Sequence, residues 1–254
     1  MKTRALSLLG AAAVLATLLV SGAATSASGQ IPEKFTNLKI FPPDISQADL
    51  VASMRGMSGA LGVRCDFCHA RAEGQAHPDW ASDAKEEKVA ARIMLEMTRM
   101  LNAEQLPKLP ERHEGVQITC RTCHRGQPVP YAIEDLLSNA YQKGGLDSLA
   151  SKYESLRAKY HGYDTYNFGS SMLPDLAQRI GGHDKPTETA RIAEYNLKWF
   201  PESGYTYYVL GQAHASAGDE EAGIRDLNKA ITLDPELKGR VERALEEIKQ
   251  KRGK

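Results

Sequence analysis

The sequence predicts an all-α protein made of two units in tandem. One indication is an apolar stripe at helical spacing in the first half, formed by Leu50, Met54, Met57 and Leu61. A second is a helical stripe in the other half, without the alternation that marks strands, formed by Leu149, Tyr153, Leu156 and Tyr160. A third is an internal period of 34 residues between Pro201 and Pro235, which is typical of helical repeats.

The composition is that of an ordinary water-soluble globular chain. Of 254 residues, 42% are hydrophobic and 25% are charged. These fractions exclude a disordered chain, a collagen and a polytopic membrane protein. The 32 basic residues balance the 32 acidic ones, so no basic field is available to recruit nucleic acid.

The first element is a targeting segment. Lys2 and Arg4 precede an apolar run over 5–20, and small residues follow over 21–29. This order predicts a secretory signal peptide over 1–27. An uncleaved membrane anchor is the alternative, although the run is shorter than the roughly 20 residues that a span needs. We therefore expect a periplasmic protein, exported and either free or membrane-associated.

The next elements are two cysteine motifs that use every cysteine in the chain. Both read C-x-x-C-H, and they are Cys65–Cys68–His69 and Cys120–Cys123–His124. This spacing lets two thiols add to the two vinyl groups of one porphyrin, and the following His lies under the iron as its proximal ligand. The motifs predict two covalently bound haem c groups.

Other uses of paired cysteines fit less well. Zinc ribbons separate their pairs by about 15–20 residues, whereas Cys65 and Cys120 lie 55 positions apart. A thioredoxin-type site would be single and would lie in a βαβ pattern. Neither of these, nor two structural disulfides, explains a His directly after both pairs.

A helix before each motif supplies a candidate for the sixth iron ligand. Ser46 is a predicted N-cap for a helix over 47–60, and Gly62 ends it. Met54 lies 11 residues before Cys65, so a helix and a short turn return its sulfur to the far face of that haem.

The second cysteine motif is also preceded by a predicted helix that carries a methionine. Ser82 is expected to cap a helix over 83–102, whose Met97 is the candidate ligand of the second haem. Three further methionines on these helices are expected to pack in the core or at the haem edges: Met57, Met94 and Met100. His77 and His113 are rival distal ligands, and exposed loop positions are the expected alternative for both.

These stretches resemble a known family. The matching segments are Met54-Arg55-Gly56, 60–65, 97–102 and 120–126. They are similar to the cytochrome c subunit of photosynthetic reaction centres, in which each haem lies beside a helix whose Met is the distal ligand. The resemblance covers about residues 35–130 and implies that role for Met54 and Met97. Well-known members carry four haems, whereas this chain has motifs for two.

The C-terminal half is predicted to be a helical array. Residues 127–130 are expected to link a dihaem cytochrome c domain over 31–130 to a repeat domain over 131–254. Window 204–237 fits the tetratricopeptide pattern well, and window 170–203 fits it loosely. A polar capping helix is expected over 238–252. Stacked helix pairs leave a concave face for partners.

The expected function is electron transfer. His/Met ligation saturates both irons, so that electrons but no substrate reach the metal. A dihaem peroxidase would need an open iron, and a scaffold in which the repeats lead is a further alternative. We therefore expect a carrier that is not an enzyme, with redox proteins of a membrane complex as partners, docked through the repeats.

Overall fold

The computed structural model describes residues 31–111 and 115–252. The expected signal peptide and His113 lie outside this range. Every regular element within it is helical, with no strand, which confirms the all-α expectation. No helix among these residues has both the length and the apolar character needed to cross a bilayer.

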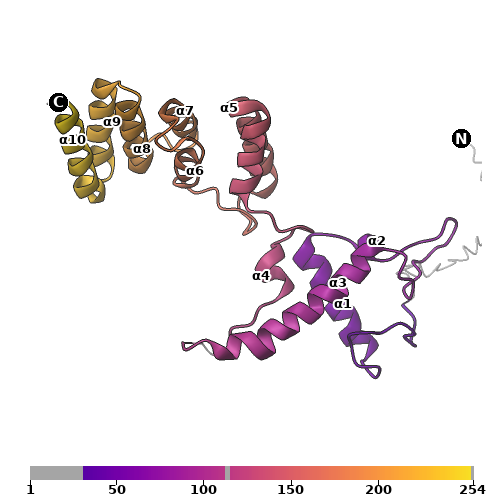
Figure 1. Cartoon of the computed structure of the whole chain (residues 1–254). Coiled ribbons are helices and arrows are strands. Elements are labelled where there is room, and N and C mark those ends of the chain that lie inside the picture. The colour runs from indigo at the N-terminus through magenta and orange to yellow at the C-terminus, as the bar shows by residue number, and fades with distance from the viewer. Residues whose placement is uncertain (1–30, 112–114, 253–254) are drawn as a thin grey trace, which may run out of the picture.

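The helices fall into two groups, and Figure 1 shows α1–α4 in one part of the molecule and α5–α10 in the other. The elements are α1 (Gln47–Leu61), α2 (Cys65–Cys68), α3 (Glu86–Met100), a π-helical turn (Leu101–Gln105), a 3₁₀ turn (Leu106–Lys108), α4 (Cys120–His124), α5 (Ile133–Tyr160), α6 (Met172–Gly181), α7 (Pro186–Asn196), α8 (Gly204–Ser216), α9 (Glu220–Leu233), a 3₁₀ turn (Pro235–Leu237) and α10 (Lys238–Arg252).

Helix α1 forms where the sequence predicts it. The Ser46 hydroxyl accepts the Asp49 N–H at 3.1 Å and so satisfies one of the free donors of the first turn. At the other end Gly62 has φ 68°, a left-handed cap that glycine adopts without steric cost. The prediction of a helix over 47–60 is therefore confirmed to within one residue.

The expected start of the next helix is wrong. Helix α3 begins at Glu86 rather than at residue 83, and its N-cap Lys85 makes no side-chain capping bond. The Ser82 hydroxyl instead accepts the N–H of Ala84 at 3.2 Å, within a turn. The reason is Asp83, whose carboxylate contacts three partners outside the helix start: Lys39 at 3.0 Å, Arg92 at 2.9 Å and Asn37 at 2.8 Å.

The element α5 is a hairpin of two helices, which the sequence did not predict. Gly144 and Gly145 have non-helical backbone angles, and Gly145 has φ 64°. Ala140 and Ser155 line one shallow groove together, yet a straight helix would hold them roughly 22 Å apart. The chain therefore doubles back at the glycine pair, giving helices over 133–143 and 146–160.

The later helices pack in sequence as pairs. Helix α6 packs against α7, α7 against α8, α8 against α9, and α10 against α9 (Figure 1). The turns inside the pairs carry Gly182 with φ 53° and Gly218 with φ 93°. Three successive helix pairs, counting the α5 hairpin, thus turn at a glycine with positive φ.

The C-terminal unit has an apolar core made of two clusters, one over 133–213 and one over 227–248, and Tyr205, Tyr207 and Tyr208 pack against both. Its fully buried side chains include Leu137, Leu149, Tyr153, Leu173, Leu176, Ile192, Val209, Leu227 and Val241. One buried polar pair lies among them, where Asn196 donates to the Thr206 hydroxyl at 2.8 Å. Burial of this amount of apolar surface is what makes a helical unit fold by itself.

Candidate haem-binding sites

The first motif places its histidine in a protected position. Cys65 and Cys68 begin and end helix α2, and the His69 N–H donates to the Cys65 carbonyl at 3.0 Å. The His69 ring is buried and meets the Trp80 ring edge-on, with 5.0 Å between centroids. Its Nδ1 is buried without a hydrogen-bond partner among the described residues.

The surroundings of His69 favour its neutral form. Burial is the main cause that lowers the pKa of the imidazole, the charges of Lys88 and Arg92 lower it further, and the Trp80 backbone partly opposes the shift. A neutral imidazole has a free lone pair, and this is the form that ligates a metal.

The first motif buries its second thiol more than its first. Burial raises the pKa of the Cys68 thiol, and the Glu87 carboxylate raises it further. Cys65 is exposed, and none of the four cysteines forms a disulfide with another. Within the described residues, no three His, Cys, Asp or Glu side chains converge to hold a metal ion by themselves.

The second motif orients its histidine through the backbone that follows it. Thr122 Oγ1 accepts the Thr119 N–H at 3.0 Å and fixes the start of α4. Arg125 and Gly126 then adopt positive φ, 47° and 86°. This turn brings the Gln127 carbonyl to 2.8 Å from His124 Nδ1. A carbonyl can only accept, so Nδ1 carries the proton and Nε2 keeps its lone pair for a metal.

The segment before the first motif lies against the segment after the second, because α1 packs against α4. The Gly126 N–H donates to the Ala60 carbonyl at 2.8 Å. A Cβ on Gly62 would lie 2.3 Å from the Gly126 carbonyl oxygen, so only glycine permits this approach. Gly62 precedes the first motif by three residues and Gly126 follows the second by two, so this backbone contact joins the flanks of the two motifs.

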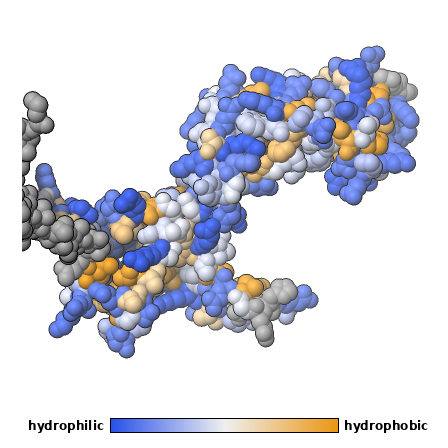
Figure 2. All heavy atoms as spheres, turned by 180° about the vertical axis from the view of Figure 1, so that it is seen from behind, coloured by the Kyte–Doolittle hydropathy of each residue, from blue (hydrophilic) through white to orange (hydrophobic). Residues whose placement is uncertain are grey.

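The apolar face of α3 is exposed, as expected of a surface that an apolar group covers. None of its residues, all of which the structure describes, is buried. The side chains of its apolar face are between 39% and 56% exposed: Val89, Ile93, Met94, Met97 and Met100. In Figure 2 apolar surface also shows in the part of the molecule that holds α1–α4. A porphyrin is a large apolar group of the kind that would cover such a face, so these residues fit haem.

The predicted sulfur ligands lie on separate helices. Met54 is half-buried on α1 and Met97 is exposed on the apolar face of α3, while His77 is exposed in the loop before α3. Helix α2 packs against α3, and α3 also touches α4. The assignment of Met54 and Met97 to the two irons stays a prediction.

One set of residues near the second motif was not expected from the sequence. A loop after α5 bonds to the segment around α4, although Gln127 was expected to begin a linker. Asp164 binds Arg121 at 2.8 Å, Thr165 Oγ1 donates to the Arg125 carbonyl at 2.8 Å, and the Tyr166 hydroxyl donates to Gln127 Oε1 at 2.5 Å. No pattern signals these contacts, because they join loops about 40 residues apart.

Comparison with known proteins relates part of the chain to photosynthetic cytochromes. The model of the family described as "Photosynthetic reaction centre cytochrome C subunit" matches residues 72–192, a range that holds the second motif, Met97 and the 164–166 loop. Cytochrome c-554 of Chloroflexus aurantiacus is 42% identical over 72 residues, which are 28% of this chain and 16% of that protein.

Two photosynthetic reaction center cytochrome c subunits are also similar. The one from Rubrivivax gelatinosus is 32% identical over 101 residues, 39% of this chain and 24% of its own length. The one from Thermochromatium tepidum is 30% identical over 110 residues, 42% of this chain and 24% of its own length. The chain thus spans a quarter or less of these relatives, and no solved structure gives a significant match.

Proposed function

We propose that the chain is an exported dihaem cytochrome c that passes single electrons between redox partners. The observation that carries this proposal is the pair of C-x-x-C-H motifs, in which the His69 ring is buried against Trp80 and His124 Nδ1 is held by the Gln127 carbonyl at 2.8 Å. The likeness to cytochrome c-554 and to reaction centre cytochrome subunits supports it.

Each haem is assigned a set of ligands from this chain. Cys65 and Cys68 attach the first group and Cys120 and Cys123 the second, with His69 and His124 as proximal ligands and Met54 and Met97 as distal ligands. When bound, haem c supplies a one-electron iron couple whose potential is raised by Met/His ligation. The protein contributes attachment, ligands and a backbone contact between the segments that flank the two motifs, and the proposed ligands leave no open iron position for a substrate.

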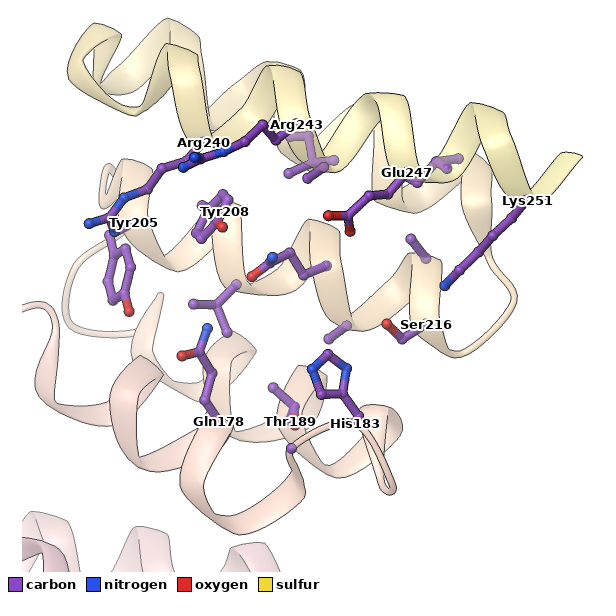
Figure 3. Close-up of a pocket in the computed structure, with 18 residues that line it drawn as sticks. Gln178, His183, Thr189, Tyr205, Tyr208, Ser216, Arg240, Arg243, Glu247 and Lys251 are labelled. Carbon is purple, nitrogen blue, oxygen red and sulfur yellow. The ribbon is translucent and has the colours of Figure 1, made fainter.

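The C-terminal unit is proposed as a tetratricopeptide-like docking array. Its helix pairs, each turning at a glycine, stack one on the next. A groove of about 540 Å³ lies among α6, α8 and α10 (Figure 3). Its charged side chains are Arg240, Arg243, Lys251 and Glu247.

The charges of this groove favour an acidic occupant. Three of its charged side chains are cationic and one is a carboxylate, so an acidic segment of a protein partner complements the groove better than a basic segment. Tyr205 and Tyr208 stack at 6.1 Å between centroids and add an apolar surface beside Arg240. We propose that a membrane-bound electron-transfer complex presents such a segment.

The haem assignment is tested on protein exported from a host that attaches haem c. Mass spectrometry should show two covalent haems, and the optical spectrum should be low-spin and unchanged by carbon monoxide. A high-spin spectrum that responds to carbon monoxide would show an open iron and would favour the peroxidase alternative. A haem count other than two would refute the assignment.

Docking is tested separately by charge reversal in the groove. Arg240→Glu with Arg243→Glu should abolish crosslinking to the partner in native membranes and leave haem content unchanged. Arg225→Glu with Lys229→Glu, on the exposed side of α9 and outside the groove, is the matched control and should crosslink normally. Equal crosslinking by both pairs would place the docking surface elsewhere.

A further inference from the structure

Gln127 is bonded at both of its ends. Its backbone carbonyl accepts from His124 Nδ1 at 2.8 Å, and its side-chain oxygen accepts the Tyr166 hydroxyl at 2.5 Å. Gln127 and Tyr166 are both buried, so the bond between their side chains is shielded from bulk water, while the bond to His124 is partly buried. The orientation of the His124 acceptor is therefore set in part by a residue of the C-terminal unit.

Tyr166 is itself held by the core of that unit. Its ring meets Tyr160 edge-on at 5.2 Å and Phe168 at 6.2 Å, and Phe168 meets the fully buried Tyr153 at 5.7 Å. Burial raises the pKa of the Tyr166 phenol, so the hydroxyl remains a donor at neutral pH. Through these contacts the position of the hydroxyl follows the packing of α5.

The neighbouring loop residues support the same junction. Thr165 donates to the Arg125 carbonyl at 2.8 Å, at the residue with left-handed backbone that turns the chain back toward His124. Asp164 pairs with Arg121, but both side chains are more than half exposed and such a pair contributes little. The partly buried bond of Thr165 and the buried bond of Tyr166 therefore do most to fix the turn.

We propose that Tyr166 is a positioning residue for the second haem, acting through Gln127 on the proximal ligand His124. The inference rests on the proposed function, because it takes His124 as an iron ligand. It adds that the C-terminal unit takes part in setting the redox potential of one haem and not only in docking.

The first motif has no counterpart of this arrangement. His69 Nδ1 lacks a hydrogen-bond partner among the described residues, and its ring meets Trp80 of the same unit. The two haems are thus expected to respond differently to changes in the 164–166 loop, which gives the protein an internal control.

The sign of the effect follows from the ligand. A hydrogen bond from Nδ1 to a carbonyl makes the imidazole a stronger donor and stabilises oxidised iron. Loss of the Tyr166 hydroxyl lets the Gln127 carbonyl move and weakens this bond. The second haem should then hold its electron more tightly, with a higher midpoint potential.

The test uses the full-length holoprotein with Tyr166→Phe and Gln127→Leu, singly and together. In a redox titration, each variant should change the reduced-to-oxidised ratio of one haem at fixed ambient potential by about threefold to tenfold toward reduced. The shift is small because both variants act on His124 indirectly and leave the Gln127 carbonyl and the proposed iron ligands in place. The double variant should shift no further than either single variant, because both remove the same bond.

Tyr163→Phe is the matched control, since Tyr163 lies in the same loop and is exposed. It should leave both potentials unchanged, and circular dichroism should report the same helix content for all variants. Unchanged potentials in Tyr166→Phe, equal shifts at both haems, or additive shifts in the double variant would overturn the role of Tyr166. A wild-type protein that lacks two haems would instead refute the proposed function.

Discussion

The two units of the molecule differ in what fills their interior. Among the described residues of 31–130, the buried apolar side chains are Leu50, Ala60 and Pro78, and α3 turns a row of apolar side chains to the surface. The C-terminal unit buries an apolar side chain on nearly every turn, several of them completely. The first unit thus buries few of its own apolar side chains, whereas the second has a core made of its own side chains.

This difference shows that the same sequence pattern can have two structural outcomes. In the C-terminal unit an apolar residue at helical spacing indicates a buried contact with another helix. In the first unit the same spacing on α3 leaves the apolar side chains exposed. The haem groups that we propose for this unit would cover such a surface, and the amino-acid core alone would then understate what holds the unit together.

The comparison is tested most severely by a chain that carries no haem. When it is produced without export, 31–130 should lose protection from hydrogen exchange almost completely, while 133–248 should keep that of the holoprotein. The reason is that the second region buries its apolar surface without a cofactor. Equal protection in both regions would show that the first unit folds without haem.

A truncated side chain in the core of the C-terminal unit should destabilise that unit without changing the haem content of the first. Leu173→Ala removes a fully buried side chain and should lower the free energy of unfolding of the C-terminal unit by about 2–5 kcal/mol. Haem content should stay the same. Leu109→Ala, at an exposed position of the first unit, is the control and should change the free energy of unfolding by less than about 0.5 kcal/mol. Denaturant titration followed by circular dichroism measures both.

Replacement of the distal ligands sharpens the picture of the first unit. Met54→His should lower the midpoint potential of one haem and leave the other nearly unchanged, because imidazole replaces a thioether that raises the potential. Met97→His should do the same at the other haem. If neither variant shifts a potential in spectroelectrochemical titration, the ligands are other residues, and Met94, Met100 and His113 are the next to replace.

The smallest expected effect concerns Asp83. Its bonds to Arg92, Lys39 and Asn37 hold the pKa of this carboxyl far below its usual range. The contribution of Asp83 to stability is therefore present above the pKa of the unfolded chain, near 3.9, and is lost as the pH falls below it toward the folded value.

The measurement is a pH series on the wild type and Asp83→Asn. The variant should be slightly less stable at pH 7, and the difference should shrink only below about pH 4. Because the Lys39–Asp83 ion pair is partly exposed, added salt should also reduce the difference in stability between the wild type and the variant. A stability difference that is independent of pH would show that the charge of Asp83 does not matter.

Local signals in the sequence predicted local structure well. Ser46 and Gly62 bound α1 as expected, since capping depends on residues within one turn. The windows around the 34-residue period contain α6–α9, and α10 occupies the expected final segment. The cysteine motifs gave the candidate sites for the same reason, because the spacing itself carries the chemistry.

The failures involve residues that act over a distance. Ser82 had the right chemistry for a cap, but Asp83 binds Asn37 and Lys39, more than 40 positions away, and the helix begins later. The glycine pair inside α5 was visible in the sequence, and its meaning depends on a positive φ that only the structure shows. The bonds of the 164–166 loop could not be predicted, because nothing local distinguishes Tyr166 from other tyrosines.

Backbone meets backbone where Gly62 approaches Gly126, with no side chain between them to absorb a change. The flanks of the two cysteine motifs are therefore tied together at this point by a 2.8 Å hydrogen bond from the Gly126 N–H to the Ala60 carbonyl. A single methyl group at Gly62 would force these two backbones apart. Under the proposed function such a change would reach both haem sites at once, because Gly62 lies three residues before Cys65 and Gly126 lies two residues after His124.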